Sequence, residues 1–152
     1  MKLSKNVQYY GKDESLPEQI NLKSGPLNLF YEAGDLRYIK YGDKEIIRRI
    51  YVAVRDRNWD TVKPVLSNVK MDIKDDSFII TYTVNNIQSD IDFCWQGKII
   101  GKANGTITFS MDGEALSTFW RNRIGFCILH PMEYASTAVS YTHLTLPTTP
   151  YV

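Results

Sequence analysis

Apolar and polar residues alternate over most of this chain, which is the pattern of β-strands with one buried face. The clearest case is residues 65–74 followed by residues 78–84, with residues 75–77 as the turn between them. The apolar residues that share a face are Val69, Met71 and Ile73 in the first run, and Phe78, Ile80, Tyr82 and Val84 in the second. We therefore predict a hairpin here.

Further segments also have strand character and are separated by turns rich in Gly, Asn and Asp. They are residues 19–22, 27–31, 36–41, 45–55, 91–100, 106–111 and 124–129. Residues 45–55 also fit helical spacing, but no capping box precedes them and their β-branched residues favour a strand. Arg48 and Arg49 indicate a bulge or bend there, because two adjacent charges cannot both face a core.

The predicted fold class is all-β, an antiparallel β-sandwich, because short strands and Gly, Asn and Asp turns dominate and almost no helix is expected. The length of 152 residues suits one domain. We expect an irregular lead-in over residues 1–24, the β-sandwich domain over residues 25–134 and a tail over residues 135–152.

The tail has a pattern unlike the rest of the chain. Residues 139–152 contain no Lys, Arg, Asp or Glu, and their start resembles the in-frame translation of a transposon-end adapter used in sequencing libraries. The alternative is a genuine Thr-rich extension. If the tail is adapter-derived, the junction lies between Tyr134 and Val139, His143 carries no chemistry, and the native part is the N-terminal part of a larger multidomain protein.

The composition indicates which binding partners and which cellular compartment to expect. A formal net charge of +1 gives no reason to expect nucleic acid or a membrane surface as a partner. Ten Tyr, six Phe and three Trp support β structure first and a sugar-binding surface only weakly. Cys94 and Cys127 each lie in an apolar run, so we expect two buried free thiols in a reducing, cytoplasmic setting rather than a disulfide. No metal-ligand spacing is present, and no cofactor is expected.

One candidate site lies in residues 119–131. An extended chain places Arg121 and Arg123 on one face and Asn122 on the other. The apolar run 124–129 that follows predicts a strand buried on both faces. Its arginines would form either a structural ion-pair site or the wall of an anion-binding pocket, since the planar guanidinium matches a carboxylate. His130 at the strand end is a weak candidate for a general base and more simply a hydrogen-bonded structural residue.

A second candidate site is the charged loop with Arg55, Arg57, Asn58 and Trp59. Together these residues could hold an anionic or hydroxylated ligand. The simpler interpretation is an Arg–Asp surface network with Trp59 folded back onto the sandwich. Asp112 and Glu114 could act as paired carboxylates, but the Gly between them favours a solvated turn. No nucleophile motif and no phosphate loop is present.

Several segments together resemble the N-terminal domain of the D-apionate lactonase family, and the resemblance covers most of residues 25–133. The segments that carry it are residues 34–38, 48–59, 90–93, 111–115 and 121–131. The resemblance implies a hydrolase that opens a sugar-acid lactone in bacterial apiose catabolism. It also implies a central TIM-barrel-like domain with the catalytic machinery, which this sequence lacks, so no catalytic residue is carried over.

The resemblance makes Arg57, Arg121 and Arg123 candidates for an interface or a pocket wall facing that barrel, with a small sugar-acid lactone as the substrate. Two alternatives remain open. The domain could be a non-catalytic, carbohydrate-associated β-sandwich of another sugar-processing enzyme. It could also be an independent sandwich of the aldose-epimerase kind, with His130 and Glu114 as acid and base.

Overall fold

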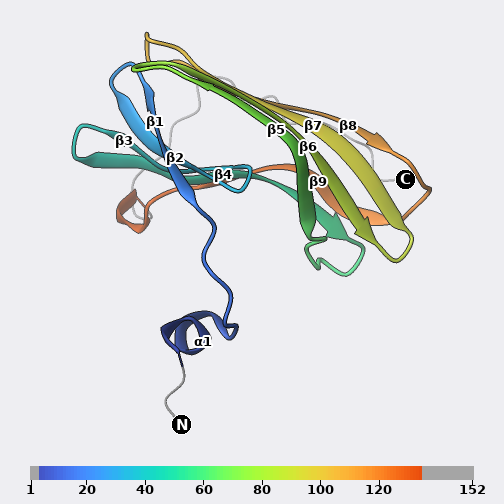
Figure 1. Ribbon diagram of the computed structural model, residues 1–152. Coiled ribbons are helices and arrows are strands. Elements are labelled where there is room, and N and C mark those ends of the chain that lie inside the picture. Colours follow the sequence, from blue (N-terminus) through green and yellow to red (C-terminus); the bar gives the residue numbers. More distant parts are fainter. Residues whose placement is uncertain (1–3, 135–152) are drawn as a thin grey trace.

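Two antiparallel sheets pack face to face over residues 4–134, the part of the chain that this computed structural model describes (Figure 1). The first sheet has the order β1-β2-β3-β4-β9, and the second has the order β5-β6-β7-β8. The five strands of the first sheet are β1 (Gln19–Ser24), β2 (Leu27–Glu32), β3 (Asp35–Tyr41), β4 (Lys44–Asp56) and β9 (Arg121–Leu129). The four strands of the second are β5 (Pro64–Ile73), β6 (Phe78–Gln88), β7 (Ile91–Gly101) and β8 (Ile107–Ala115). The predicted all-β antiparallel sandwich is confirmed.

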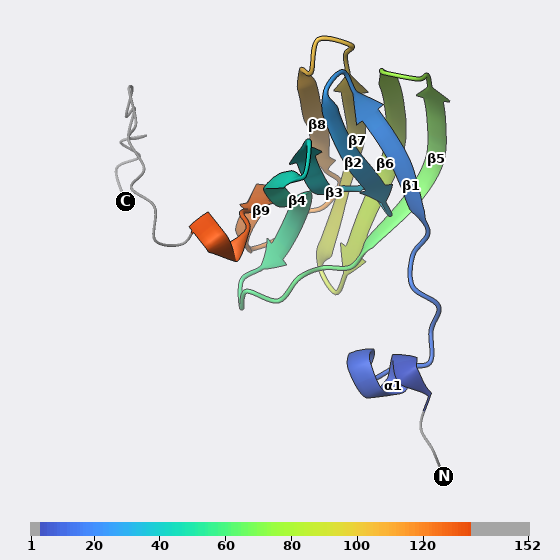
Figure 2. The ribbon, with the colours of Figure 1, turned by 90° about the vertical axis from the view of Figure 1, so that its left-hand side faces the viewer.

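Two short helical elements flank the sheets. The helix α1 (Lys5–Tyr10) begins at Ser4, whose hydroxyl accepts a hydrogen bond from the Val7 N–H, and ends at Gly11 with a left-handed φ of 73°. Figure 2 shows α1 away from both sheets, joined to β1 by an extended segment. A 3-10 helix, η1 (Met132–Tyr134), follows β9. The sequence did not predict α1, because six residues give too little helical periodicity.

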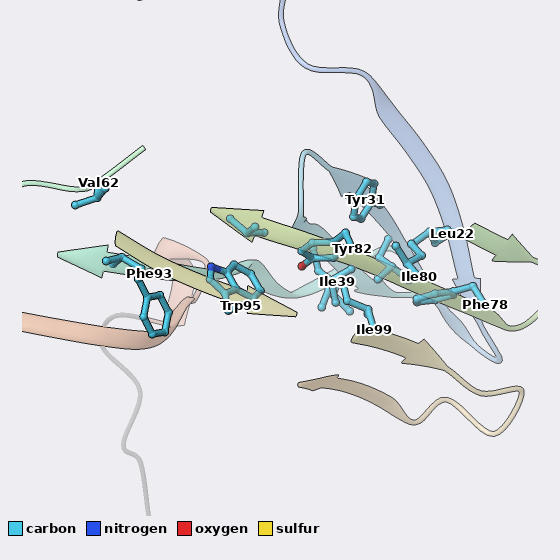
Figure 3. Packing of buried hydrophobic residues seen from close by; sticks show 14 of the residues in the cluster. Leu22, Tyr31, Ile39, Val62, Phe78, Ile80, Tyr82, Phe93, Trp95 and Ile99 are labelled. Atoms are coloured by element: carbon cyan, nitrogen blue, oxygen red, sulfur yellow. The ribbon is translucent and has the colours of Figure 1, made fainter. Parts of the chain in front are cut away.

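The hydrophobic core lies between the sheets and is centred on the inner face of β6. All four residues predicted to share a face there are at most 2 % exposed: Phe78, Ile80, Tyr82 and Val84. Figure 3 shows the first three among the buried side chains. The Tyr82 hydroxyl donates a hydrogen bond of 2.7 Å to the Gly34 carbonyl, which joins the two sheets. Burial raises the pKa of Tyr82 far above its usual value, so this hydroxyl stays protonated and remains a donor.

Most of the expected strands are present with small shifts. β5 and β6 form the predicted hairpin, with Ile73 opposite Phe78. Residues 45–55 are a strand. The irregularity in its pairing with β3 lies opposite Ile39 and Lys40, just before Arg48 and Arg49, where the bulge or bend was predicted. The two arginines are accommodated by ion pairs, Arg48 with Glu45 and Arg49 with Asp35.

The prediction for the run 124–129 was wrong. The run lies in β9 at the edge of its sheet, paired with β4, and is not buried on both faces. Phe126, Ile128 and Leu129 are 42 %, 52 % and 43 % exposed. An apolar run indicates that a strand is suited to burial, but it does not say whether anything within the same domain covers the strand.

The predicted turn at residues 112–115 is also wrong. Asp112 and Glu114 lie in β8, opposite Gln96 and Cys94, and both are exposed. Gly113 has another role there: a Cβ at this position would lie 2.5 Å from the Phe93 ring. The glycine therefore lets an aromatic core residue approach the strand closely, which its sequence neighbours do not reveal.

Three other predictions concerned the cysteines, the tail and membrane-spanning segments. Cys94 and Cys127 are free thiols, and both are half-buried rather than fully buried. The predicted tail, residues 135–152, lies outside the described residues. In the part that is described, the helices are too short to cross a membrane.

Candidate functional site

Arginines gather where the end of β4 meets the start of β9. The antiparallel pairing places Arg55 opposite Arg123 and Asp56 opposite Arg121. The loop that carries Arg57 follows β4 directly, so both stretches singled out from the sequence lie at the same end of one sheet. The sequence could not show this, because the pairing of β4 with β9 joins distant parts of the chain.

The loop after β4 has its shape fixed by its own first residues. The Asp56 carboxylate accepts hydrogen bonds from the backbone N–H groups of Asn58 (2.8 Å) and Asp60 (2.9 Å). Arg55 Nη1 donates to the Trp59 carbonyl at 3.1 Å and to Thr61 Oγ1 at 3.0 Å. These bonds leave the Arg57, Asn58 and Trp59 side chains on the outside. Trp59, with a φ of 73°, is 56 % exposed and is not folded back onto the sandwich.

The base of this loop is held inside the core. The Val62 N–H donates to the Val54 carbonyl at 2.9 Å, and the Val62 carbonyl accepts from Asn86 Nδ2 at 3.0 Å. Asn86 Oδ1 in turn accepts from Trp95 Nε1 at 3.0 Å. A buried amide therefore fixes the loop to the other sheet, and the sequence analysis did not single out this residue.

A pocket lies beside the loop. It has a volume of about 280 Å³, and its lining residues are Asp56, Arg57, Asn58, Gln88, Ser89, Asp90, Ile91 and Trp120. Trp120 is 78 % exposed. Residues 88–90, where β6 turns into β7, and Trp120 were not predicted as site residues from the sequence. The signal for Trp120 was its position beside Arg121, since an exposed Trp next to a cation is a common element of binding surfaces.

The seven arginines of the chain differ in how they are neutralised. Arg37, Arg48 and Arg49 form salt bridges with carboxylates. The hydrogen bond from Arg37 lowers the pKa of the Glu32 carboxyl, whereas burial raises that of Asp35 despite its contact with Arg49.

The other four arginines, at the end of β4 and the start of β9, form no salt bridge with any of the described residues, and Arg57, Arg121 and Arg123 also make no side-chain hydrogen bond there. This unpaired set, Arg55, Arg57, Arg121 and Arg123, is called the arginine end below. It has guanidinium donors available for a carboxylate from outside the domain.

The remaining candidates lie elsewhere. Asn122 is half-buried, between two exposed arginines. β9 separates His130 from Arg121 by roughly 30 Å, at about 3.3 Å per residue, so His130 does not share the arginine end. His130 follows a strand of one sheet, and Glu114 lies on an exposed position of the other. Across residues 4–134, no cluster of His, Cys, Asp and Glu suited to a metal ion is found.

The structure thus defines an all-β sandwich domain that combines an arginine-rich end with an apolar edge strand. The family match is specific: residues 7–148 match the family described as "D-apionate lactonase, N-terminal domain", and the chain belongs to that family. The match extends into the segment predicted to be adapter-derived, whose origin remains a prediction for the coding DNA to test.

A curated relative gives the same assignment. The D-apionate lactonase of Brucella anthropi is 37 % identical over 128 residues, which cover 81 % of this chain and 20 % of the relative. The chain therefore spans about a fifth of the length of this relative. No solved structure matches the chain significantly.

Proposed function

We propose that this chain is the N-terminal domain of an enzyme that hydrolyses a sugar-acid lactone, with the catalytic groups in a TIM-barrel-like domain further along the polypeptide. The observation that carries the proposal is the match to a D-apionate lactonase over 81 % of this chain but only 20 % of the relative. A domain of this size in a much longer enzyme fits a supporting role. Free thiols at Cys94 and Cys127 support a cytoplasmic location.

The arginine end has a chemical role in this proposal. Lactone hydrolysis requires water to attack the ring ester carbonyl while the developing oxyanion is stabilised. The product is a hydroxy acid, and its carboxylate suits a guanidinium that is not already paired. We infer that Arg57, Arg121 and Arg123 face the downstream domain, either as an interface or as a wall of the substrate pocket.

Substitution of each of these arginines in the full-length lactonase tests the inference. Arg57→Ala, Arg121→Ala and Arg123→Ala are compared with Arg48→Ala, a control on an exposed ion pair whose loss should change stability little. If these arginines form a wall of the substrate pocket, their variants should change KM or kcat for lactone hydrolysis at unchanged stability. If they form a domain interface, their variants should lower stability and leave the kinetics intact. Kinetics and stability both unchanged in all three variants would refute this role.

A second candidate function is favoured by the exposed Trp59 and Trp120. Aromatic faces at the arginine end suit a sugar ring, as in a non-catalytic, carbohydrate-associated sandwich. Titration of tryptophan fluorescence with the hydroxy-acid product distinguishes the two candidates. Saturable quenching by this chain alone, abolished by Trp120→Ala, supports direct sugar-acid binding. Quenching that appears only in the full-length enzyme supports a wall completed by the barrel.

A further inference from the structure

The sandwich is open along the side where the edge strands β8 and β9 lie. β9 pairs with β4 along one edge, and no strand within residues 4–134 pairs with its other edge. The register places Ile124, Phe126 and Ile128 opposite Val54, Val52 and Ile50. Paired residues share a face, and Val54 is 1 % exposed in the core, so these three side chains of β9 point into the sandwich.

The inner face is nevertheless not closed at this side. The Phe126 ring lies 5.0 Å from that of Phe109 on β8, in an edge-to-face arrangement at 69°. Although it lies between the sheets, Phe126 is 42 % exposed, and Ile128 is 52 % exposed. Exposed apolar side chains grouped in this way mark an interaction surface more often than a free surface.

On the opposite side of the sandwich, the edge strand β5 has features that protect it from pairing with another strand. Edge strand β5 also exposes apolar side chains, Met71 at 37 % and Ile73 at 43 %. It carries a register shift between Ser67 and Lys70 and a charge at Asp72, which are devices that protect an edge from pairing. The second half of β9, residues 124–129, has no charged residue and no such shift. This half of the β9 edge is therefore unprotected.

The path of the chain indicates what covers this side. After β9 the chain turns through η1, which is held against the start of β4. The Tyr134 hydroxyl donates to the Glu45 carbonyl at 3.0 Å, and Lys44 Nζ lies 5.4 Å from the centre of the Tyr134 ring. The described part of the chain thus ends beside the start of β4, just after the exposed end of β9. In the relative, the part outside the matched 20 % is four times as long as this match.

We propose that the β8–β9 opening, formed by Phe109, Phe126 and Ile128, is the docking surface for the downstream part of the same polypeptide. An apolar surface of that part closes the sandwich and covers the edge of β9. This rests on the proposed function, in which a long domain follows. It also explains the position of the arginine end: β9 runs from Arg121 to the opening, so a domain docked along β9 reaches these guanidinium groups.

Hydrogen–deuterium exchange tests the docking directly. Peptides covering residues 121–134 are compared between the full-length lactonase and the 152-residue chain. We expect exchange to be roughly tenfold or more slower in the full-length protein, because docking protects the edge amides. Peptides from β5 serve as the internal control and should not change. Equal exchange of residues 121–134 in both proteins would overturn the proposal. Protection that depends on protein concentration would also overturn it, because it would assign the surface to a second copy.

Substitutions in the full-length protein give an independent measurement. Phe126→Asp and Ile128→Asp are compared with Ile79→Asp, a control on the outer face of β6 with a similar exposure of 43 %. The β9 variants should raise proteolytic cleavage in the segment after residue 134 at least several-fold, and the control should not. Equal cleavage in all three would contradict docking. Lactone hydrolysis by the full-length protein is measured separately. If the protein hydrolyses the lactone but the β9 amides are not protected from exchange, the docking surface is refuted and the proposed function stands. If the β9 amides are protected but the protein does not hydrolyse the lactone, the proposed function is refuted and the docking surface stands.

Discussion

Asn86 is a buried amide on which the position of the arginine loop depends. It is 2 % exposed, donates to the Val62 carbonyl and accepts from the Trp95 indole, each at 3.0 Å. Asn86→Ala removes both partners at once and leaves a carbonyl and an indole N–H unpaired in the core. Each such group costs about 1–3 kcal/mol, so the sum is about 2–6 kcal/mol. Water entering the vacated space would reduce the cost, and we expect about 3 kcal/mol.

This loss is large for a small domain, whose total stability is about 5–15 kcal/mol. The assay is urea unfolding followed by tryptophan fluorescence, in which Trp95 itself reports. With a slope of about 1–3 kcal/mol per M, the midpoint should fall by roughly 1–3 M while the slope stays constant. Asn85→Ala is the matched control: the side chain is on the opposite face of the same strand, and its loss should cost no more than about 0.5 kcal/mol.

The outcome that refutes this reasoning is an Asn86→Ala variant no less stable than Asn85→Ala. The amide would then not be a necessary link between the sheets. A second readout concerns the loop itself. Because Val62 fixes the base of the loop, amides of residues 56–61 should exchange faster in Asn86→Ala, even at urea concentrations where the domain is folded. Unchanged loop exchange would mean that Asp56 and Arg55 alone fix the loop.

Two further predictions concern close packing and pH. Gly101→Ala should destabilise the domain by about 2 kcal/mol, because its Cβ would lie 2.2 Å from the Phe78 ring. Gly42→Ala meets no atom within 4 Å and should cost only about 1 kcal/mol for its φ of 58°; equal losses in thermal unfolding would contradict the packing argument. Arg37 lowers the pKa of Glu32 from 4.5, so this carboxylate adds stability above that pH, and the stability is lost as the pH falls through the lowered value. Glu32→Gln should therefore flatten the dependence of unfolding free energy on pH below 4.5, and an unchanged slope would refute this.

The sandwich itself could be predicted because its strands alternate strictly where one face is buried. β6 shows this best: its four predicted inner residues are all buried. The misread turn at residues 112–115 shows the limit of local signals. Gly113 and its acidic neighbours have turn chemistry, but the glycine is required by the Phe93 ring of the neighbouring strand. Close approach of a distant side chain leaves no mark in the local sequence.

The candidate site was predictable residue by residue but not as an assembly. Arg55, Arg57, Arg121 and Arg123 could be singled out from composition, yet all seven arginines look alike in the sequence. Their difference is created by tertiary structure, which brings Asp35 to Arg49. Within residues 4–134 it brings no carboxylate into ion-pairing distance of the arginine end. Whether an arginine is neutralised depends on strand pairing, and strand order is the part of a β-sandwich that alternation does not specify.

β9 shows why an apolar strand can be misread in an informative way. Its sequence suits burial on both faces, and the domain covers one edge with β4 while leaving Phe126 and Ile128 open. If the polypeptide beyond residue 134 completes the burial, the sequence analysis was wrong about this domain but right about the full-length protein. The mismatch between a buried pattern and an exposed strand is then itself a signal of a missing neighbour. The same reasoning predicts that β5, with its charge and irregular register, stays exposed in the full-length enzyme.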